Sequence, residues 1–210
     1  MKKLLLLLFL FQIQLNYSQD VIKIQGKNCP MEGDAQQEQE IKQNPFKNRY
    51  KFPKKKDIDE SITINYLLKA KGDDPKLSQD MAVMITGYVR FVKGGSKETC
   101  NCHASKVAFT DAHIEITPTK KIKGIKNTLI LEVTPRIRKL MFEDGEDWST
   151  SELKDALEGK VVTFTGWLFY DGSHEDEAFA NDTKNKIGKK NWRGTCWEVH
   201  PVTNIEIVNP

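Results

Sequence analysis

The chain has 210 residues, of which 32 are Lys or Arg and 29 are Asp or Glu, so its formal net charge is +3. This length suits one domain with a core of its own plus an extension, or two small domains. The near balance of charge excludes the strongly basic field with which whole domains attract nucleic acid.

Residues 1–19 have the pattern of a secretory signal peptide. Lys2 and Lys3 precede an apolar run from Leu4 to Phe11, and Ser18 offers a small residue for cleavage. The run is shorter than the roughly 20 apolar residues that cross a bilayer, so no transmembrane segment is expected after the signal is removed. Loss of the two lysines lowers the net charge from +3 to +1. We expect the mature protein to be secreted or periplasmic.

Residues 20–80 are predicted to form a polar N-terminal extension. The stretch 32–43 is rich in Gln and Glu and is compatible with a short helix. A basic stretch with interleaved aromatic residues follows, from Lys47 to Lys56, and such a stretch can follow a phosphate backbone and stack on bases. A charge run is more often a solvated segment, and the near-neutral chain makes nucleic acid an unlikely partner. Ser61 to Leu68 is apolar enough to dock on the main domain.

The main domain is predicted to span residues 81–210 and to consist of five strands and one helix. Alternating apolar residues indicate strands, and Ser149-Thr150-Ser151-Glu152 resembles the capping box of a helix that Gly159 ends. Gly87 and Gly166 interrupt two strands, and a glycine within a strand usually marks a bulge or a sharp bend. The predicted strands cover residues 81–93, 111–117, 127–134, 161–170 and 195–208.

Three strands, a helix and two further strands follow one another in the order of an OB-fold barrel. The run Trp197-Glu198-Val199-His200-Pro201-Val202 in the last strand, with Cys100-Asn101-Cys102-His103 after the first, is similar to uncharacterised exported bacterial proteins of that shape. The resemblance implies a mainly β fold, a five-stranded OB-like barrel with a mixed N-terminal extension. It does not extend to secreted OB-type nucleases, because their paired Asp and Arg pattern cannot be placed on this chain.

Strand parity groups several titratable side chains on one face of the predicted sheet. His113 and Glu115 alternate with Ile114 and Ile116, because successive side chains of a strand point to opposite faces. The same alternation places three more residues opposite the apolar side of their strands: Glu132, Glu198 and His200. If the second, third and fifth strands are neighbours, these residues share one surface.

Two loops that usually rim the ligand site of an OB fold also carry histidines, His103 and His174. Convergence of imidazoles with a carboxylate would suit a divalent metal such as Zn²⁺, with an open position for water. The candidate metal ligands are therefore His103, His113, His174 and His200, and Glu115 or Glu198 would be the catalytic base. The alternative, which we favour, is that the histidines form hydrogen bonds that organise the loops.

Four cysteines in an exported chain are more often paired than metal-bound. Cys100 and Cys102 are too close in sequence to bridge each other comfortably. Either could reach Cys196 or Cys29, and we favour Cys196 as the partner. Metal-binding cysteine pairs usually show C-x₂-C spacing, so Cys100-Asn101-Cys102 is a weak metal motif.

The tryptophans divide by parity and flanking charge. Trp167 and Trp197 are predicted to pack in the core, whereas Trp148 and Trp192 have charged neighbours that would suit exposed stacking platforms. Trp192 and Arg193 together could hold an anionic or sugar-like ligand, or Trp192 could simply close a loop over the barrel.

The function favoured by these patterns is an exported binding or interaction module for a small-molecule, glycan or protein ligand. Its ligand residues would be His103, His174, Trp192, Arg193 and His200. The alternatives are an extracytoplasmic metal-dependent hydrolase, such as a phosphodiesterase or nuclease, and a nucleic-acid-binding protein.

Overall fold

A computed structural model describes residues 20–208 except for positions 71, 73, 123–126 and 179–192. The predicted signal peptide and Trp192 lie outside the described residues. None of the helices within these ranges is both long and apolar enough to cross a membrane.

Five strands close into a barrel, which confirms the predicted mainly β, OB-like architecture. Their spatial order is β3-β4-β5-β7-β6, and every pairing is antiparallel except that of β5 with β7. The first strand, β3, is long enough to pair with β6 through its first half and with β4 through its second, which closes the barrel. The strands are β3 (Ala82–Gly94), β4 (Ala112–Thr117), β5 (Leu129–Val133), β6 (Val161–Tyr170) and β7 (Trp197–Ile207).

Two helices, rather than the single one predicted, connect β5 to β6. The predicted helix is α5 (Thr150–Leu157), and the Ser149 hydroxyl accepts a hydrogen bond from the backbone N–H of Glu152. The helix that sequence reasoning missed is α4 (Pro135–Glu143), in which Pro135 occupies the first turn and the side chain of Thr134 caps the start.

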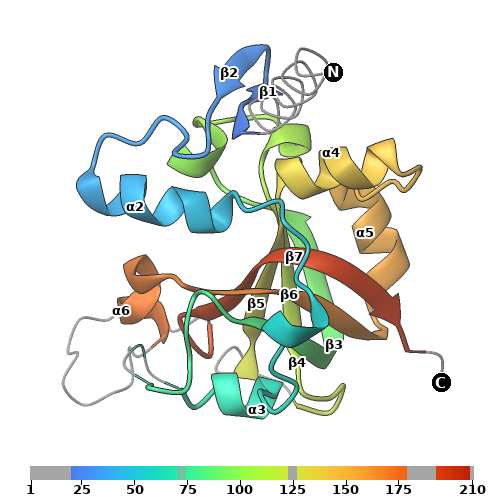
Figure 1. Cartoon of the computed structure of the whole chain (residues 1–210). Helices are drawn as coiled ribbons and strands as arrows, with labels where there is room; N and C mark the ends of the chain where they lie inside the picture. The colour runs from blue at the N-terminus through green and yellow to red at the C-terminus, as the bar shows by residue number, and fades with distance from the viewer. Residues whose placement is uncertain (1–19, 71, 73, 123–126, 179–192, 209–210) are drawn as a thin grey trace, which may run out of the picture.

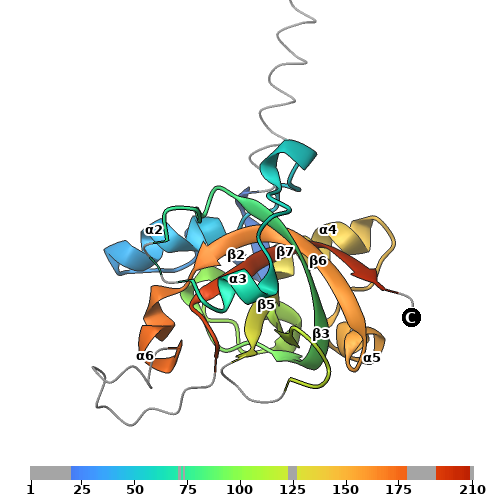
Figure 2. The same ribbon diagram turned by 90° about the horizontal axis from the view of Figure 1, so that it is seen from below.

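The N-terminal extension packs on the barrel through several short elements (Figure 1). A hairpin of β1 (Ile22–Ile24) and β2 (Lys27–Cys29) precedes α2 (Glu38–Lys47), which begins and ends later than the predicted helix. The segment predicted to dock forms α3 (Ile64–Leu67), and its buried Ile64 and Leu67 belong to the main core. Seen from below, α3 lies at one end of the barrel (Figure 2).

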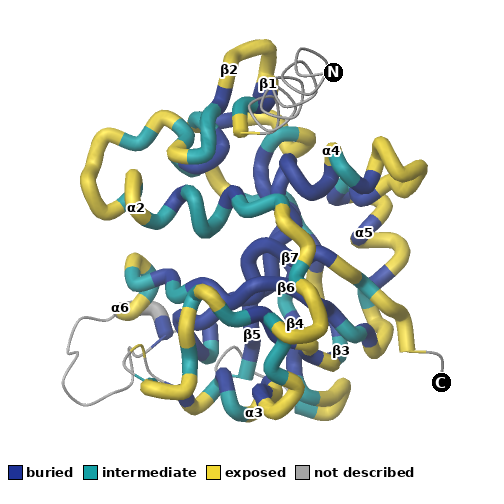
Figure 3. The backbone as a smooth tube through the Cα atoms, viewed as in Figure 1, coloured by how far each residue is buried: buried dark blue, intermediate teal, exposed yellow. Residues whose placement is uncertain are grey.

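The apolar core fills the barrel, and exposed residues lie on helices, on loops and on the outer face of β3 (Figure 3). Trp197 and Val199 face this core, as parity predicts. The alternation within β3 also predicts that Phe91 faces the core, but this prediction is wrong. The pairing of β3 with β4 shifts register between Val89 and Phe91. Phe91 is therefore 42% exposed, and Val92 takes the buried position. Gly166 lies at the predicted irregularity, where the pairing of β6 with β7 shifts register.

Candidate functional site

Neighbouring strands β4 and β5 bring His113 together with two carboxylates. His113 and Glu132 are directly paired across the strands, so their side chains share a face. His113 Nδ1 lies 3.0 Å from Glu132 Oε1, and His113 Nε2 lies 3.6 Å from Glu115 Oε1. Burial lowers the pKa of His113, but the hydrogen bonds to Glu115 and Glu132 raise it to about 9. This imidazole is therefore charged at neutral pH.

Strand β7 adds Glu198 and His200 to the same group because it lies parallel to β5. His200 Nδ1 is 3.3 Å from Glu132 Oε2 and 3.4 Å from Glu198 Oε2. The structure thus assembles the five residues that parity places on one face. They do not form an open surface, since Glu132, Glu198 and His200 are 6%, 2% and 0% exposed.

Arg193 and Asp111 complete this group, which we call the ionic cluster: Asp111, His113, Glu132, Arg193, Glu198 and His200. Arg193 is buried, and its guanidinium forms an ion pair with Glu198 rather than facing solvent. Burial raises the pKa of Glu198, but the charges of Arg193 and His200 outweigh it and hold that pKa well below its ordinary value. Glu198 therefore stays ionised.

Asp111 is the member of the cluster that sequence reasoning missed. It precedes β4, is 1% exposed, and accepts a hydrogen bond through Oδ2 from the Asn101 amide at 2.9 Å. Burial and the negative charge of Glu132 raise its pKa to about 7. The available signal was its place as the first residue of the predicted strand 111–117, two positions before His113 and therefore on the same face of that strand.

The loops that carry His103 and His174 meet in a pocket of about 310 Å³, which we call the polar pocket. It lies between α2 and the turn that precedes α6 (Glu175–Ala178) (Figure 1). His103 Nδ1 is 2.8 Å from Asp34 Oδ2, and His174 Nε2 is 3.7 Å from Asp171 Oδ2. His103 and His174 line this pocket, whereas His113 and His200 belong to the ionic cluster, so the four candidate histidines form two sets.

Lys47 lies at the floor of the polar pocket and joins it to the ionic cluster. Its ammonium is 2.8 Å from Glu98 Oε2 and 3.4 Å from Asp171 Oδ2, and it lies 5.3 Å from the centre of the Phe169 ring. Burial lowers the pKa of Lys47, but the charges of Glu98 and Asp171 raise it well above its ordinary value. Lys47 is therefore a fixed cation.

The structure corrects two predictions about cysteine and tryptophan. The disulfide joins Cys29 to Cys102, with a Cα–Cα distance of 5.9 Å, and Cys100 and Cys196 are buried free thiols. The favoured pairing with Cys196 is wrong because the β1–β2 hairpin places Cys29 beside the loop of Cys102. Trp148 is not an exposed platform: it is 7% exposed and packs in the main core.

In the basic stretch from Lys47 to Lys56, the first two cationic residues, Lys47 and Arg49, form contacts with other residues of the protein. Lys47 is half-buried in its ion pairs with Glu98 and Asp171, and Arg49 donates hydrogen bonds to the backbone carbonyls of Gln79 and Leu168. The Arg49 guanidinium also lies 5.0 Å from the centre of the Trp167 ring. These contacts leave fewer cations for a phosphate backbone and do not favour nucleic-acid binding.

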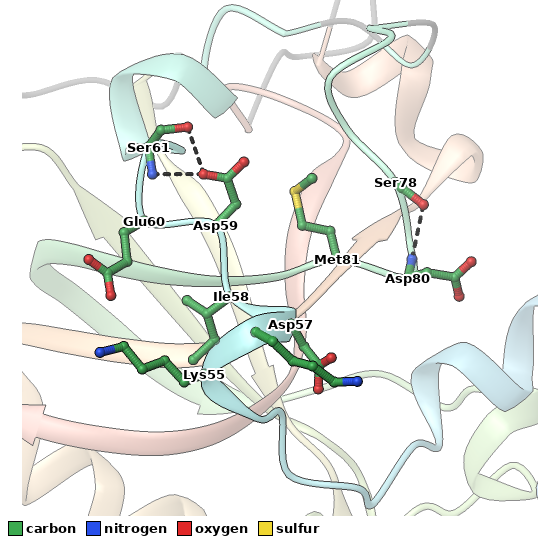
Figure 4. Close-up of a pocket in the computed structure, with 10 residues that line it drawn as sticks. Lys55, Asp57, Ile58, Asp59, Glu60, Ser61, Ser78, Asp80 and Met81 are labelled. Carbon is green, nitrogen blue, oxygen red and sulfur yellow. Dashed lines mark hydrogen bonds between the residues drawn. The ribbon is translucent and has the colours of Figure 1, made fainter.

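A larger hollow of about 810 Å³ lies on the surface, between residues 55–61 and 78–81 (Figure 4). Two of its carboxylates are engaged locally: Asp59 accepts hydrogen bonds from the Ser61 backbone and hydroxyl, and Asp57 accepts one from the Lys54 backbone N–H. The hollow is lined by no histidine, whereas His103 and His174 line the polar pocket, so we place the candidate site at the polar pocket.

Comparisons with known proteins identify no relative from which a role for this site could be inferred, so its geometry is the basis for the proposal below. A scan against protein-family models found no match, and a search of curated proteins found no relative of the chain.

Proposed function

We propose that this protein is an exported binding module that holds a small polar ligand, of the size of a sugar unit, in the polar pocket. The observation that carries the proposal is the meeting of the His103 and His174 loops at a pocket that is also lined by the ion pairs of Lys47 with Glu98 and Asp171. These are the loops that rim ligand sites on OB-like barrels. The Cys29–Cys102 disulfide supports export, because such bonds persist in oxidising compartments.

The lining of the pocket favours a ligand that forms hydrogen bonds. Its side chains offer both charged donors and acceptors, from Lys97 and Glu40 to the imidazoles of His103 and His174. The volume of about 310 Å³ is at the lower end of ligand pockets, which span roughly 300–1,000 Å³. A preorganised floor reduces the cost of binding, since Lys47 is held by two carboxylates before a ligand arrives.

A metal-dependent hydrolase is less well supported. The two candidate bases are engaged: Glu198 pairs with Arg193, and Glu115 lies 3.6 Å from both His113 Nε2 and Lys93 Nζ. A general base must come within hydrogen-bond reach of its substrate. Glu198 is 2% exposed, so a substrate in the polar pocket would not reach it.

The test is a ligand titration that is monitored by NMR through the imidazole resonances of His103 and His174. A panel of monosaccharides, amino acids and nucleotides is added to labelled protein, and we expect one class to shift the His103 and His174 ring resonances. Gln43→Trp places a bulky ring in the pocket lining and should abolish the shift. The matched control is Gln39→Trp, one turn earlier on α2 and exposed, which should leave binding intact. A panel without effect, or binding that survives Gln43→Trp, would refute the proposal.

A further inference from the structure

Within the ionic cluster, three side chains from different segments converge on one point. A carboxylate oxygen of Asp111, one of Glu132 and a ring nitrogen of His200 all lie within 4.8 Å of one another. They come from the residue before β4, from β5 and from β7, so the barrel itself fixes their spacing. Rigid strands hold such a constellation more accurately than loops do.

Two buried polar atoms of the same residues have no hydrogen-bond partner among the described residues. They are Oδ1 of Asp111 and Nε2 of His200, in side chains that are 1% and 0% exposed. A buried polar atom left unsatisfied costs about 1–3 kcal/mol, and native structures usually resolve it with an ion or a water. These two atoms belong to two of the three converging residues, and they indicate that an ion or a water binds between them.

The pairing of charges also leaves Asp111 without a cationic hydrogen-bond partner in the described part of the chain. Its recorded donor is the neutral amide of Asn101. The neighbouring carboxylates all have one: Glu198 with Arg193, Glu132 with His113, and both Glu98 and Asp171 with Lys47. A buried carboxylate is normally paired or bound to a metal.

We propose that Asp111, Glu132 and His200 bind one divalent cation, and that this cation is Zn²⁺. An imidazole with two carboxylates is a donor set that zinc accepts, whereas Ca²⁺ and Mg²⁺ prefer oxygen ligands alone. Glu198 lies 3.4 Å from His200 Nδ1, so it can orient the imidazole as carboxylates do beside zinc-binding histidines.

The test is a zinc titration of the mature protein, purified without chelator and free of any affinity tag. We expect one Zn²⁺ per chain by calorimetry and elemental analysis. Asp111→Asn keeps the shape of the side chain and its contact with Asn101 but removes the charge, and should weaken zinc binding by at least about 100-fold. Asp34→Asn is the matched control: Asp34 pairs with the exposed His103 outside the cluster, so zinc affinity should not change.

A second measurement covers the case in which Asp111→Asn fails to fold. In the wild-type protein, zinc should shift the ring-nitrogen resonances of His200 and leave those of His103 and His174 in place. The proposal is overturned if the folded protein binds no zinc at micromolar concentration, if Asp111→Asn binds it as tightly as the wild type, or if the shifts appear at the pocket histidines. Preferential binding of Ca²⁺ or Mg²⁺ would overturn the assignment to zinc. These results do not depend on ligand binding in the polar pocket.

Discussion

Lys47 of helix α2 donates a hydrogen bond to Glu98, 51 positions later in the chain, with 2.8 Å between Nζ and Oε2. The same ammonium reaches Asp171 after β6, at 3.4 Å. One side chain therefore ties the N-terminal extension to two loops of the barrel. This contact makes the extension part of the candidate site, because all three residues line the polar pocket.

Replacement of Lys47 is predicted to destabilise the protein. Lys47→Met leaves Glu98 and Asp171 without their shared cation, and because these pairs are half-buried the cost should lie between the roughly 1 kcal/mol of an exposed pair and the roughly 3 kcal/mol of a buried one. The measurement is urea denaturation. Lys42→Met is the control on the same helix, since Lys42 forms an exposed pair with Glu38 that contributes little. Equal effects of the two variants would show that the ion pairs of Lys47 are not important for stability.

The disulfide prediction concerns which thiols are free. Without reductant, unfolded protein should take up two alkyl labels, on Cys100 and Cys196, and a digest should contain a peptide linking Cys29 to Cys102. With reductant, four labels are expected. Because the bridge closes a loop with a sequence separation of 73, its loss in a Cys29→Ser, Cys102→Ser variant should cost about 4 kcal/mol. Four labels on unreduced protein would contradict the assignment.

Strand periodicity was sufficient to predict much of the ionic cluster. His113 and Glu132 share a face because both alternate with core residues, and neighbouring strands then place them opposite each other. The alternation predicts which side chains share a face but not whether that face is exposed. Helix α2 packs against β7 although α2 ends at Lys47 and β7 begins at Trp197, and such a contact cannot be read from the alternation.

Positions outside regular strands could not be predicted in the same way. The partner of Cys102 is fixed by the position of the β1–β2 hairpin, which ends at Cys29, 73 positions earlier in the sequence. Phe91 shows the limit within a strand, because one register shift reverses the face of every residue after it. Such contacts are tertiary and leave no periodic signal.

Gly166 is predicted to tolerate no side chain. A Cβ at this position would lie 2.4 Å from the Pro201 carbonyl oxygen and 2.9 Å from the Val202 Cα, and backbone atoms cannot move aside cheaply. We expect Gly166→Ala to destabilise the barrel by at least about 2 kcal/mol in thermal or urea unfolding. The control is Gly172→Ala, where the nearest atom, in the Tyr170 ring, would be 3.6 Å away and unfolding should hardly change. A neutral Gly166→Ala would mean that β6 and β7 are packed less closely.

His113 should make the free energy of unfolding depend on pH, with a stabilising contribution that is lost as the pH rises. Burial lowers its pKa, but hydrogen bonds to Glu115 and Glu132 raise it to about 9, above the ordinary value of about 6.5. Its contribution is therefore fully present below about pH 6.5 and is lost as the pH rises through about 9. Unfolding free energies measured with a metal chelator present should differ between wild type and His113→Gln by up to about 3 kcal/mol at pH 6, and the difference should narrow by pH 10. Glu115→Gln should lower the His113 pKa in an NMR titration, and a wild-type value at or below 6.5 would contradict this account.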